Sequence, residues 1–298
     1  MSISVLIPCF NAGGKVLKAI ASAINQIEAS EIIVIDDGST DDTSKYLALA
    51  KEQFTKDVLS SRMQIFSREN RGAQKTRNQL VEISKSEWLT FLDADDEVLG
   101  QESLLLRSQT DASVGFCNMI IQRYPGSDNE FESFLELWPT NRLPILKALA
   151  RFEYLPSTSA LMFKREVFTQ VSWDMSDTYS GGMHCFKMLL DCLKAEIAIA
   201  HVPVSGILYR EGWSPQQISG KANRVKRLFA RYAWQKNLEE WLISKYGDRY
   251  RSDLKIGAKK FNEEWAEEIK IAASQQDPSN LDRLPNLDIQ RLESNFQS

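Results

Sequence analysis

The feature that most constrains the fold of this chain is an alternation of apolar runs and amphipathic segments through residues 1–97. The apolar runs are Ser4–Pro8, Glu31–Asp36, Met63–Phe66 and Trp88–Leu92, and the segments with helical spacing between them are Val16–Ile24, Tyr46–Phe54 and Gly72–Ser84. Nearly continuous apolar strands separated by amphipathic helices are typical of a parallel sheet covered on both faces. The connections are long enough for right-handed crossovers. The pattern therefore predicts an α/β fold with a Rossmann-like, mostly parallel sheet.

The rest of the chain is organised differently. Residues 112–121 form another apolar run, which predicts a fifth strand. From residue 221 onward apolar residues recur at helical spacing, and residues 256–273 predict a further helix. The division that we expect is a main domain over residues 1–220, with halves at 1–120 and 121–220, and a helical C-terminal extension over 221–298.

Composition argues against several classes of function. The chain has 298 residues and a formal net charge of −4, so it carries no overall basic field for nucleic acid. Its four cysteines show no CxxC spacing and it has two histidines, which argues against structural zinc and favours reduced thiols. No signal peptide follows Met1 and no apolar run approaches the roughly 18 residues that span a bilayer, so we expect a cytoplasmic protein. The turn after the first strand lacks the GxGxxG of dinucleotide-dependent oxidoreductases.

Polar residues follow three of the predicted strands at the point where each strand ends. These clusters are Cys9-Phe10-Asn11, Asp36-Asp37-Gly38-Ser39 and Asp93-Ala94-Asp95-Asp96. In open α/β sheets, ligands bind beyond the carboxyl ends of the strands. Because parallel strands end at a common edge, the three clusters predict one binding site there.

The cluster that begins at Asp36 has two interpretations. Asp and Gly favour a turn, and Thr40 or Asp41 could cap the helix that follows. Alternatively, Asp37 accepts a hydrogen bond from a base N–H or a sugar hydroxyl, a role that suits an ionised carboxylate because it only accepts. The residues alone leave both interpretations open.

The cluster from Asp93 to Asp96 could also be a helix cap, through Asp95 or Asp96. However, its three carboxylates would repel one another, and neutral caps would serve equally well. A hard cation such as Mg²⁺ or Mn²⁺ would relieve this repulsion, and such ions are often held by one or two carboxylates together with substrate phosphates. A cation would also offset charge on a diphosphate leaving group. The sequence therefore favours a metal site.

A third segment, Asn70–Asn78, combines Gly72 with the basic residues Lys75 and Arg77. Gly72 would allow a tight turn that leaves N–H groups at the start of a helix. One interpretation is a solvated basic helix start. The other is that Arg77 and Asn78 steady the acidic edge or a bound sugar.

Together these segments resemble the family 2 glycosyltransferases, which have the GT-A fold. The stretches that carry the resemblance are Val5–Asn11, Glu31–Thr43, Asn70–Gly72 with Arg77-Asn78, and Phe91–Asp96, in the order and spacing of that family. The resemblance is clear to about residue 120 and weaker from there to about residue 220. It implies an inverting, metal-dependent transfer of a sugar from a nucleotide-diphospho-sugar, with a UDP-sugar favoured, to an acceptor hydroxyl in polysaccharide or glycoconjugate synthesis.

The resemblance also assigns a donor site and its partners. The residues that it implies are Pro8 and Asn11 beside the nucleotide, Asp37 at the base (usually uracil in this family), Asp93 at the ribose or donor sugar, Asp95 at a Mn²⁺ or Mg²⁺ ion, and Arg77 and Asn78 near the donor. The acceptor would be a sugar, a glycan or a lipid-linked molecule.

Inverting transfer needs a general base, because the acceptor hydroxyl must lose its proton as it attacks. In the family this base commonly lies in an adjacent acidic pair of the second half, and counting from Trp173-Asp174 that pair falls at Gly181-Gly182. Asp177 is our preferred base, and His184 is a second candidate because histidine titrates near neutral pH. The alternative is a protein that binds the nucleotide-sugar without transferring it. Asp177 could equally be a turn residue, and His184 a helix-face residue.

Two basic features of the second half extend the resemblance. A cation near residues 209–219 closes over the diphosphate in the family; Arg210 could do so, because guanidinium pairs well with phosphate oxygens, or it could be an ordinary loop cation. After residue 221 the basic residues Arg224, Lys226, Arg227 and Arg231 lie among aromatic residues. A basic amphipathic helix can lie on the inner face of an anionic membrane, whereas such an apolar stripe more often packs on the main domain.

Overall fold

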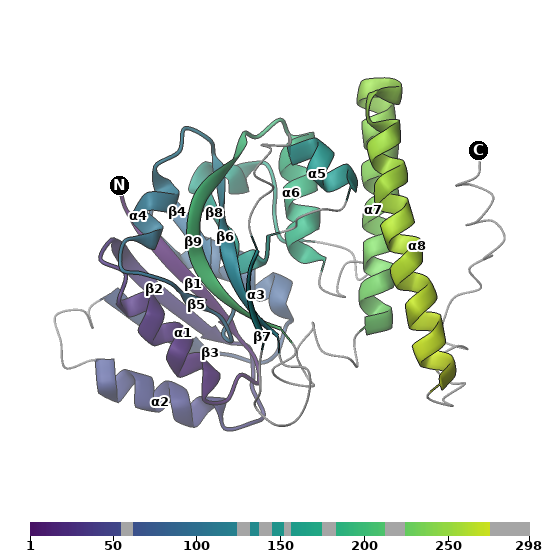
Figure 1. Ribbon diagram of the computed structural model, residues 1–298. Helices are drawn as coiled ribbons and strands as arrows, with labels where there is room; N and C mark the ends of the chain where they lie inside the picture. Colours follow the sequence, from purple (N-terminus) through teal and green to yellow (C-terminus); the bar gives the residue numbers. More distant parts are fainter. Residues whose placement is uncertain are drawn as a thin grey trace.

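A computed structural model describes residues 1–54, 62–123, 132–136, 145–151, 156–174, 183–211 and 224–274 of the chain. Within these ranges nine strands form one sheet in the order β3-β2-β1-β4-β8-β6-β9-β5, with β7 paired to β6 (Figure 1). The strands are β1 (Ile3–Cys9), β2 (Ala29–Asp36), β3 (Met63–Ser67), β4 (Trp88–Phe91), β5 (Glu97–Val98), β6 (Val114–Arg123), β7 (Glu132–Glu136), β8 (Leu161–Lys164) and β9 (Ile199–Glu211). The α/β class that the sequence predicts is confirmed.

Helices connect and cover these strands. They are α1 (Lys15–Ile24), α2 (Thr43–Phe54), α3 (Ala73–Ile83), α4 (Ser103–Ser108), α5 (Ile145–Arg151), α6 (His184–Lys194), α7 (Arg224–Tyr246) and α8 (Arg251–Ser274), with short 3₁₀ turns η2 (Thr158–Ala160), η3 (Arg165–Thr169) and η6 (Gly247–Tyr250). The predicted helices of the first 97 residues and of the C-terminal extension are all present.

The first half of the sheet is parallel, as predicted. Strand β1 pairs in parallel with β2 and β4, and β2 pairs in parallel with β3. All residues of β2 from Glu31 to Asp36 are buried, so both faces of this strand are covered. That burial explains why the apolar runs are continuous rather than alternating.

The second half of the sheet is more mixed than the sequence predicts. Strand β8 runs antiparallel to β4 and β6, while β6 and β9 are parallel. Strands β5 and β7 are antiparallel additions to β9 and β6. The apolar pattern of a buried strand identifies the strand but does not encode its direction, which is why this reversal was not foreseen.

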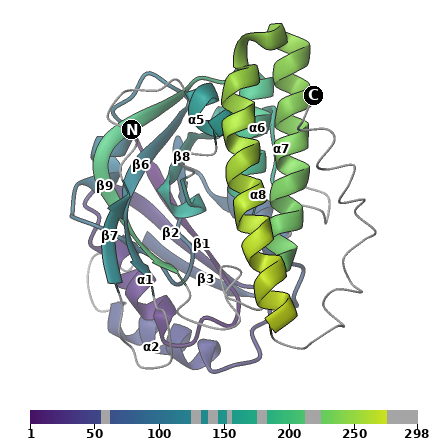
Figure 2. The same ribbon diagram turned by 45° about the vertical axis from the view of Figure 1, so that its right-hand side comes forward.

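The two long C-terminal helices stand side by side next to the main domain, beyond α5 and α6 (Figures 1 and 2). Trp234 of α7 is fully buried, and its indole N–H donates to the Phe186 carbonyl of α6 at 2.9 Å. Arg151 of α5 forms an ion pair with buried Asp253 of α8 at 2.5 Å. Gly257 of α8 allows α8 to approach α5 closely, because a Cβ at this position would lie 2.2 Å from the Ala150 carbonyl oxygen. The interpretation that the apolar stripe packs on the main domain is confirmed.

Arg231 is one of the basic residues of the extension. Arg231 is buried, and its guanidinium lies 5.6 Å from the centre of the Phe261 ring of α8. Arg231 therefore packs between α7 and α8 and does not face outward. The prediction that Arg231 belongs to a membrane-facing basic surface is corrected by this burial. In the part of the chain that the structure describes, no helix combines the length and the apolar character that crossing a bilayer requires.

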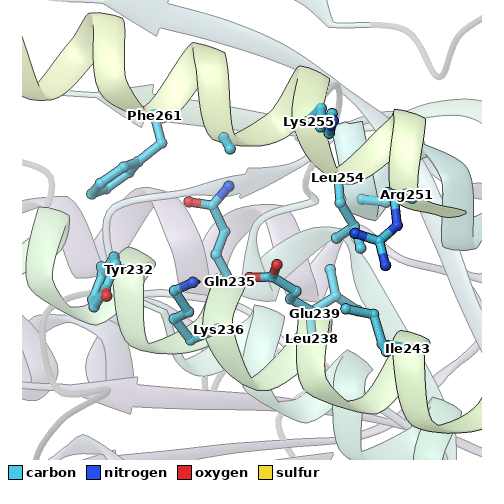
Figure 3. A pocket seen from close by; sticks show the side chains of 12 residues that line it. Tyr232, Gln235, Lys236, Leu238, Glu239, Ile243, Arg251, Leu254, Lys255 and Phe261 are labelled. Atoms are coloured by element: carbon cyan, nitrogen blue, oxygen red, sulfur yellow. Dashed lines mark hydrogen bonds and ion pairs between the residues drawn. The ribbon is translucent and has the colours of Figure 1, made fainter. Parts of the chain in front are cut away.

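A small hollow separates α7 from α8 (Figure 3). Its volume is about 100 Å³, and its walls mix apolar residues such as Leu238 and Phe261 with charged residues such as Glu239 and Arg251. Small-molecule sites usually enclose about 300–1,000 Å³. The hollow is therefore too small for a nucleotide or a sugar, and the site must be sought elsewhere.

Candidate functional site

A larger cavity, of about 510 Å³, opens at the carboxyl ends of β1 and β4 and beside the start of α3. Its lining residues are Pro8, Cys9, Phe10, Asn11, Ala12, Lys15, Asp37, Asn70, Gly72, Ala73, Thr76, Arg77, Asp93, Ala94, Asp95 and Tyr209. Six of the residues named from the sequence come together here: Pro8, Asn11, Asp37, Arg77, Asp93 and Asp95. The cavity lies where an open α/β sheet is expected to bind its ligand.

Asp37 connects the end of β2 to the loop before α3. Its backbone N–H donates to the Cys9 carbonyl at 2.8 Å, which holds it beside the end of β1. Its carboxylate accepts backbone N–H bonds from Arg71 at 3.0 Å and Gly72 at 2.8 Å, and pairs with the Arg68 guanidinium at 2.8 Å. Only 2% of Asp37 is exposed. Asp37 therefore lines the cavity and also holds the loop before α3 in place through these bonds.

The loop after β1 is tied to the loop after β2. Asn11 has a positive φ of 49°, and its side-chain oxygen accepts the backbone N–H of Thr40 at 2.8 Å. Its own backbone N–H donates to the Ser39 hydroxyl at 2.9 Å. Asp41 accepts the backbone N–H of Thr43, the first residue of α2, at 3.0 Å, so its side chain contributes to the turn that leads into the helix.

The acidic loop after β4 holds three carboxylates in three different environments. Asp93 pairs with Arg77 at 2.8 Å, and Asp95 lines the cavity. Asp96 is fully buried; it accepts the Ser159 hydroxyl at 2.6 Å and the backbone N–H of Arg210 at 3.2 Å. Burial, together with the charges of Asp95 and Asp93, raises the pKa of Asp96 well above its ordinary value. The loop therefore presents two carboxylates to the cavity and turns the third inward, where burial and the charges of the other two disfavour its ionised form.

Two carboxylates, Asp93 and Asp95, remain on the cavity side of this loop. Asp93 already shares its charge with Arg77, and no cluster of three metal-ligating side chains occurs among the described residues. Mg²⁺ and Mn²⁺ accept one or two protein carboxylates when substrate phosphates complete the coordination. The residues fit a divalent cation only in this form, with Asp95 as the protein ligand and a diphosphate as the other.

Arg77 is a buried cation at the wall of the cavity, with 5% of its surface exposed. Its guanidinium stacks 5.2 Å from the centre of the Trp173 ring, and its Nη2 donates to Asp93. Its Nε and Nη1 have no hydrogen-bond acceptor within the described residues, and neither has the Trp173 indole nitrogen. Buried donors are normally paired, but Arg62, Arg68 and Arg107 also have unpaired guanidinium nitrogens within the described residues, so this lack of an acceptor does not mark a ligand site.

Asn78 and Arg210, which the resemblance places near the donor, are not among the lining residues. Asn78 donates to the Asp174 carboxylate at 2.8 Å and accepts the backbone N–H of Trp173 at 2.9 Å. The guanidinium of Arg210 pairs with Glu97 and donates to the Asp95 carbonyl at 3.2 Å. Arg210 is therefore bonded to the acidic loop, and Asn78 connects α3 to the segment at Trp173-Asp174.

The candidate general bases fall differently in the structure. Asp177 and the pair Gly181-Gly182 lie outside the described residues. His184 is the first residue of α6, is 6% exposed, and is not among the residues that line the cavity. The described residues therefore do not assign the base.

Two lining residues, Ala12 and Lys15, lie outside the motifs that the sequence singled out, whereas Tyr209 of β9 begins the stretch at residues 209–219 that the resemblance places near the diphosphate. Lys15 begins α1 directly after Gly13-Gly14, a glycine turn followed by a lysine that could have been noticed. Burial lowers the pKa of Lys15, while the charges of Asp95 and Asp41 raise it.

The family assignment rests on a direct match. The family model described as glycosyl transferase family 2 matches residues 4–171, more than half of the chain. The chain therefore belongs to this family. The match begins at β1 and continues past β8, so it includes the loops that carry Asp37, Arg77 and Asp95.

Curated relatives match shorter stretches. The uncharacterized glycosyltransferase YibD of Escherichia coli (strain K12) is 31% identical over 148 residues, which cover 47% of this chain and 39% of the relative. The succinoglycan biosynthesis protein ExoU of Rhizobium meliloti (strain 1021) is 39% identical over 94 residues, 32% of this chain and 26% of the relative. The poly(ribitol-phosphate) beta-glucosyltransferase of Bacillus spizizenii (strain ATCC 23059 / NRRL B-14472 / W23) is 33% identical over 108 residues, 35% of this chain and 16% of the relative. The matched stretch is thus less than half of each relative.

Solved structures share the fold over most of the chain. TarS 1-349 of S. aureus in complex with UDP-GlcNAc superposes with a TM-score of 0.57 at 15% identity, covering 99% of this chain and 79% of that one. The mannosyltransferase PcManGT from Pyrobaculum calidifontis, in complex with GDP-Man and Mn²⁺, gives a TM-score of 0.60 at 13% identity, covering 92% and 76%. At such identities the likeness establishes the fold alone, which is the GT-A fold that the sequence implied.

Proposed function

We propose that this protein is an inverting glycosyltransferase that moves a sugar from a nucleotide-diphospho-sugar, preferably a UDP-sugar, to an acceptor hydroxyl. The observation that carries the proposal is the single cavity of about 510 Å³ that gathers Asp37, Arg77, Asp93 and Asp95 at one edge of the sheet. Its volume suits a nucleotide-sugar. Family membership adds support, because the matched segment contains these residues.

The donor would lie along the cavity from the β2 side to the β4 side. Pro8 and Asn11 would border the nucleotide, and Asp37 would accept from the base at the wall that it shapes. Asp93, held by Arg77, would contact the ribose or the donor sugar. The unpaired Nε and Nη1 of Arg77 could donate to the sugar hydroxyls or to the diphosphate.

Asp95 would hold a divalent cation, Mn²⁺ or Mg²⁺, together with the diphosphate of the donor. When bound, such a cation supplies positive charge that stabilises the departing diphosphate. Two features of the acidic loop support this role of Asp95: Asp96 is turned into the fold, and Asp93 is paired with Arg77. Asp95 is thereby the carboxylate that the acidic loop presents for a cation.

The base that takes the acceptor proton is the open part of the proposal. Asp177 is our preferred candidate and His184 the second, because Gly181-Gly182 stand where the family carries acidic residues. The same glycines favour one alternative: a protein of this fold that binds the nucleotide-sugar but no longer transfers it.

The proposed pathway is polysaccharide or glycoconjugate synthesis, with a sugar, glycan or lipid-linked acceptor. Relatives named for succinoglycan biosynthesis and for a poly(ribitol-phosphate) product support this choice. The acceptor half of a main domain over residues 1–220 would bind the acceptor. The basic residues Arg224, Lys226 and Arg227 at the start of α7 would allow peripheral contact with the inner face of a membrane. Flotation with phosphatidylserine vesicles tests this contact.

Calorimetry separates the proposal from its alternative. The wild-type protein should bind UDP more tightly with Mn²⁺ than with EDTA, and should hydrolyse or transfer at least one UDP-sugar. Metal-dependent UDP binding without turnover on any acceptor would favour the binding protein. Absence of both UDP and GDP binding would overturn both.

The variant Asp95→Ala tests the metal assignment. Because Asp95 is the proposed protein ligand, the variant should bind UDP equally with Mn²⁺ and with EDTA. Asp42→Ala is the matched control, since Asp42 is exposed and does not line the cavity. If Mn²⁺ still strengthens UDP binding by the Asp95→Ala protein, the cation lies elsewhere.

A further inference from the structure

Lys15 lies in the wall of the cavity but belongs to none of the motifs that define the donor site. It is the first residue of α1, is partly buried, and shares the lining with Asp95. Among the residues that the structure places around the cavity, Lys15 and Arg77 are the ones with a cationic side chain. Arg77 is already engaged with Asp93, so Lys15 is the cation whose role is unexplained.

The charges around the cavity form three oppositely charged sets. Asp37 pairs with Arg68, and Asp93 pairs with Arg77, in both cases at 2.8 Å. Lys15 shares the cavity lining with Asp95; burial lowers the pKa of Lys15, and the charges of Asp95 and Asp41 oppose that lowering. A diphosphate adds negative charge to a wall that is otherwise balanced. The flexible ammonium of a lysine is the group that can turn from a carboxylate to a phosphate oxygen.

The position of Lys15 suits a phosphate contact. Lys15 is the first residue of α1 and therefore lies at the positive end of the helix dipole, in the lining of the cavity. Arg77 lines the same cavity and adds a second cationic side chain to its wall. Both features favour an anion here.

We propose that Lys15 is a phosphate-binding residue of the donor site, whose ammonium offsets Asp95 before the nucleotide-sugar binds and contacts its diphosphate afterwards. This inference rests on the proposed function, because it assumes that a nucleotide diphosphate occupies the cavity. It makes two opposite predictions for the loss of Lys15. Affinity for a diphosphate falls, whereas affinity of Asp95 for a cation alone does not fall, because a repelling charge has been removed.

The test uses the full-length protein with three variants: Lys15→Met, Lys15→Arg and Lys18→Met. Lys18 lies one turn further along α1 and is exposed, so Lys18→Met changes the same charge on the same helix outside the cavity. Calorimetry measures binding of UDP with Mn²⁺, of uridine, and of Mn²⁺ alone. Lys15→Met should lose about ten- to a hundredfold in UDP affinity, the size of a hydrogen bond to a charged group. Its affinities for uridine and Mn²⁺ should be maintained, Lys15→Arg should recover most of the UDP affinity, and Lys18→Met should match wild type.

Several results would overturn the inference. If Lys15→Met binds UDP like the wild-type protein, Lys15 makes no phosphate contact. If its affinities for UDP, uridine and Mn²⁺ fall together, Lys15 supports the fold of the cavity instead, and a lower melting temperature would accompany that outcome. If the wild-type protein binds neither UDP nor GDP, the proposed function fails, and this inference fails with it.

Discussion

In the parallel half of the sheet, β3-β2-β1-β4, the buried charged residues Asp37 and Arg77 line the cavity, whereas Arg107 beside the mixed half lies inside the fold. Asp37 and Arg77 are paired, yet both contribute to the cavity wall. Arg107 of α4 is fully buried and donates to the carbonyls of Ser159 and Leu161. Substitutions at the cavity should therefore lower both UDP binding and stability, whereas substitutions of residues that only pack inside the fold should lower stability alone.

The largest effect is expected for Asp37→Ala, which tests the cavity half. The variant leaves Arg68 without its ion-pair partner and the backbone N–H groups of Arg71 and Gly72 without an acceptor. Breaking a buried pair by removing one partner costs about 3–5 kcal/mol. Stability in urea should fall by that amount, and UDP binding should be lost because the loop before α3 is no longer held.

The control for Asp37 is again Asp42→Ala, an exposed carboxylate in the same turn. It should change both the free energy of unfolding and the UDP affinity very little. If Asp37→Ala were destabilised but bound UDP normally, Asp37 would be a structural residue only. The contrast between the two halves would then weaken.

The second prediction concerns Trp234→Ala, in the helix pair that packs beside the mixed half. Trp234 is fully buried and donates to the Phe186 carbonyl. Replacing a buried aromatic residue by alanine costs about 3–5 kcal/mol, and we expect the lower end because α7 contacts the main domain along one side. UDP affinity should stay within about twofold of wild type, since Trp234 is remote from the cavity lining. A large loss of UDP affinity would show that the helix pair supports the donor site.

The third prediction concerns Ser159, where the two halves meet. Its hydroxyl donates to Asp96 and accepts the backbone N–H of Asp93 at 3.1 Å, so Ser159→Ala leaves buried polar groups of the acidic loop unsatisfied. Such a loss costs about 1–3 kcal/mol. Because the loop carries Asp95, the Mn²⁺-dependent part of UDP binding should also weaken, by about tenfold.

A matched control exists for Ser159. The Thr90 hydroxyl is equally buried and donates to the Leu161 carbonyl at 3.0 Å, without touching the acidic loop. Thr90→Val should lose a similar amount of stability while its UDP affinity stays unchanged. Equal losses of UDP affinity in both variants would mean that the effect of Ser159 is general destabilisation rather than positioning.

The comparison also explains what the sequence could predict. Asn11, Asp37, Asp93 and Asp95 could be placed together because each follows a strand, and parallel strands bring their carboxyl ends to one edge. Pro8 lies within β1 and was added by the resemblance to the family. Lys15 was missed because it lies one turn further on, at the start of a helix rather than the end of a strand. The donor half of the site is therefore accessible to local reasoning.

The mixed half is less accessible, because its determinants are distant in sequence. The pattern Asp93-Ala94-Asp95-Asp96 does not reveal which carboxylate turns inward; that choice is made by Ser159, 63 residues away. Arg210 pairs with Glu97, 113 residues away, while its contact with a diphosphate stays a prediction. The direction of β8 likewise depends on pairing with β4 and β6 rather than on its own residues.

The smallest effect concerns the pH dependence of stability and again belongs to the mixed half. His201 of β9 packs on Phe116 and its Nε2 lies 2.8 Å from the Asn118 side-chain oxygen; burial lowers the pKa of His201. The unfolded chain therefore binds a proton more readily than the folded one, so stability should fall as the pH drops below about 6.5, the unfolded value. His201→Gln keeps an N–H donor for Asn118 but cannot titrate. The melting temperature of wild type relative to His201→Gln should therefore decline between pH 7.5 and pH 5.5. If the melting temperatures of the two proteins instead changed equally with pH over that range, His201 would be as free to protonate in the fold as in the unfolded chain.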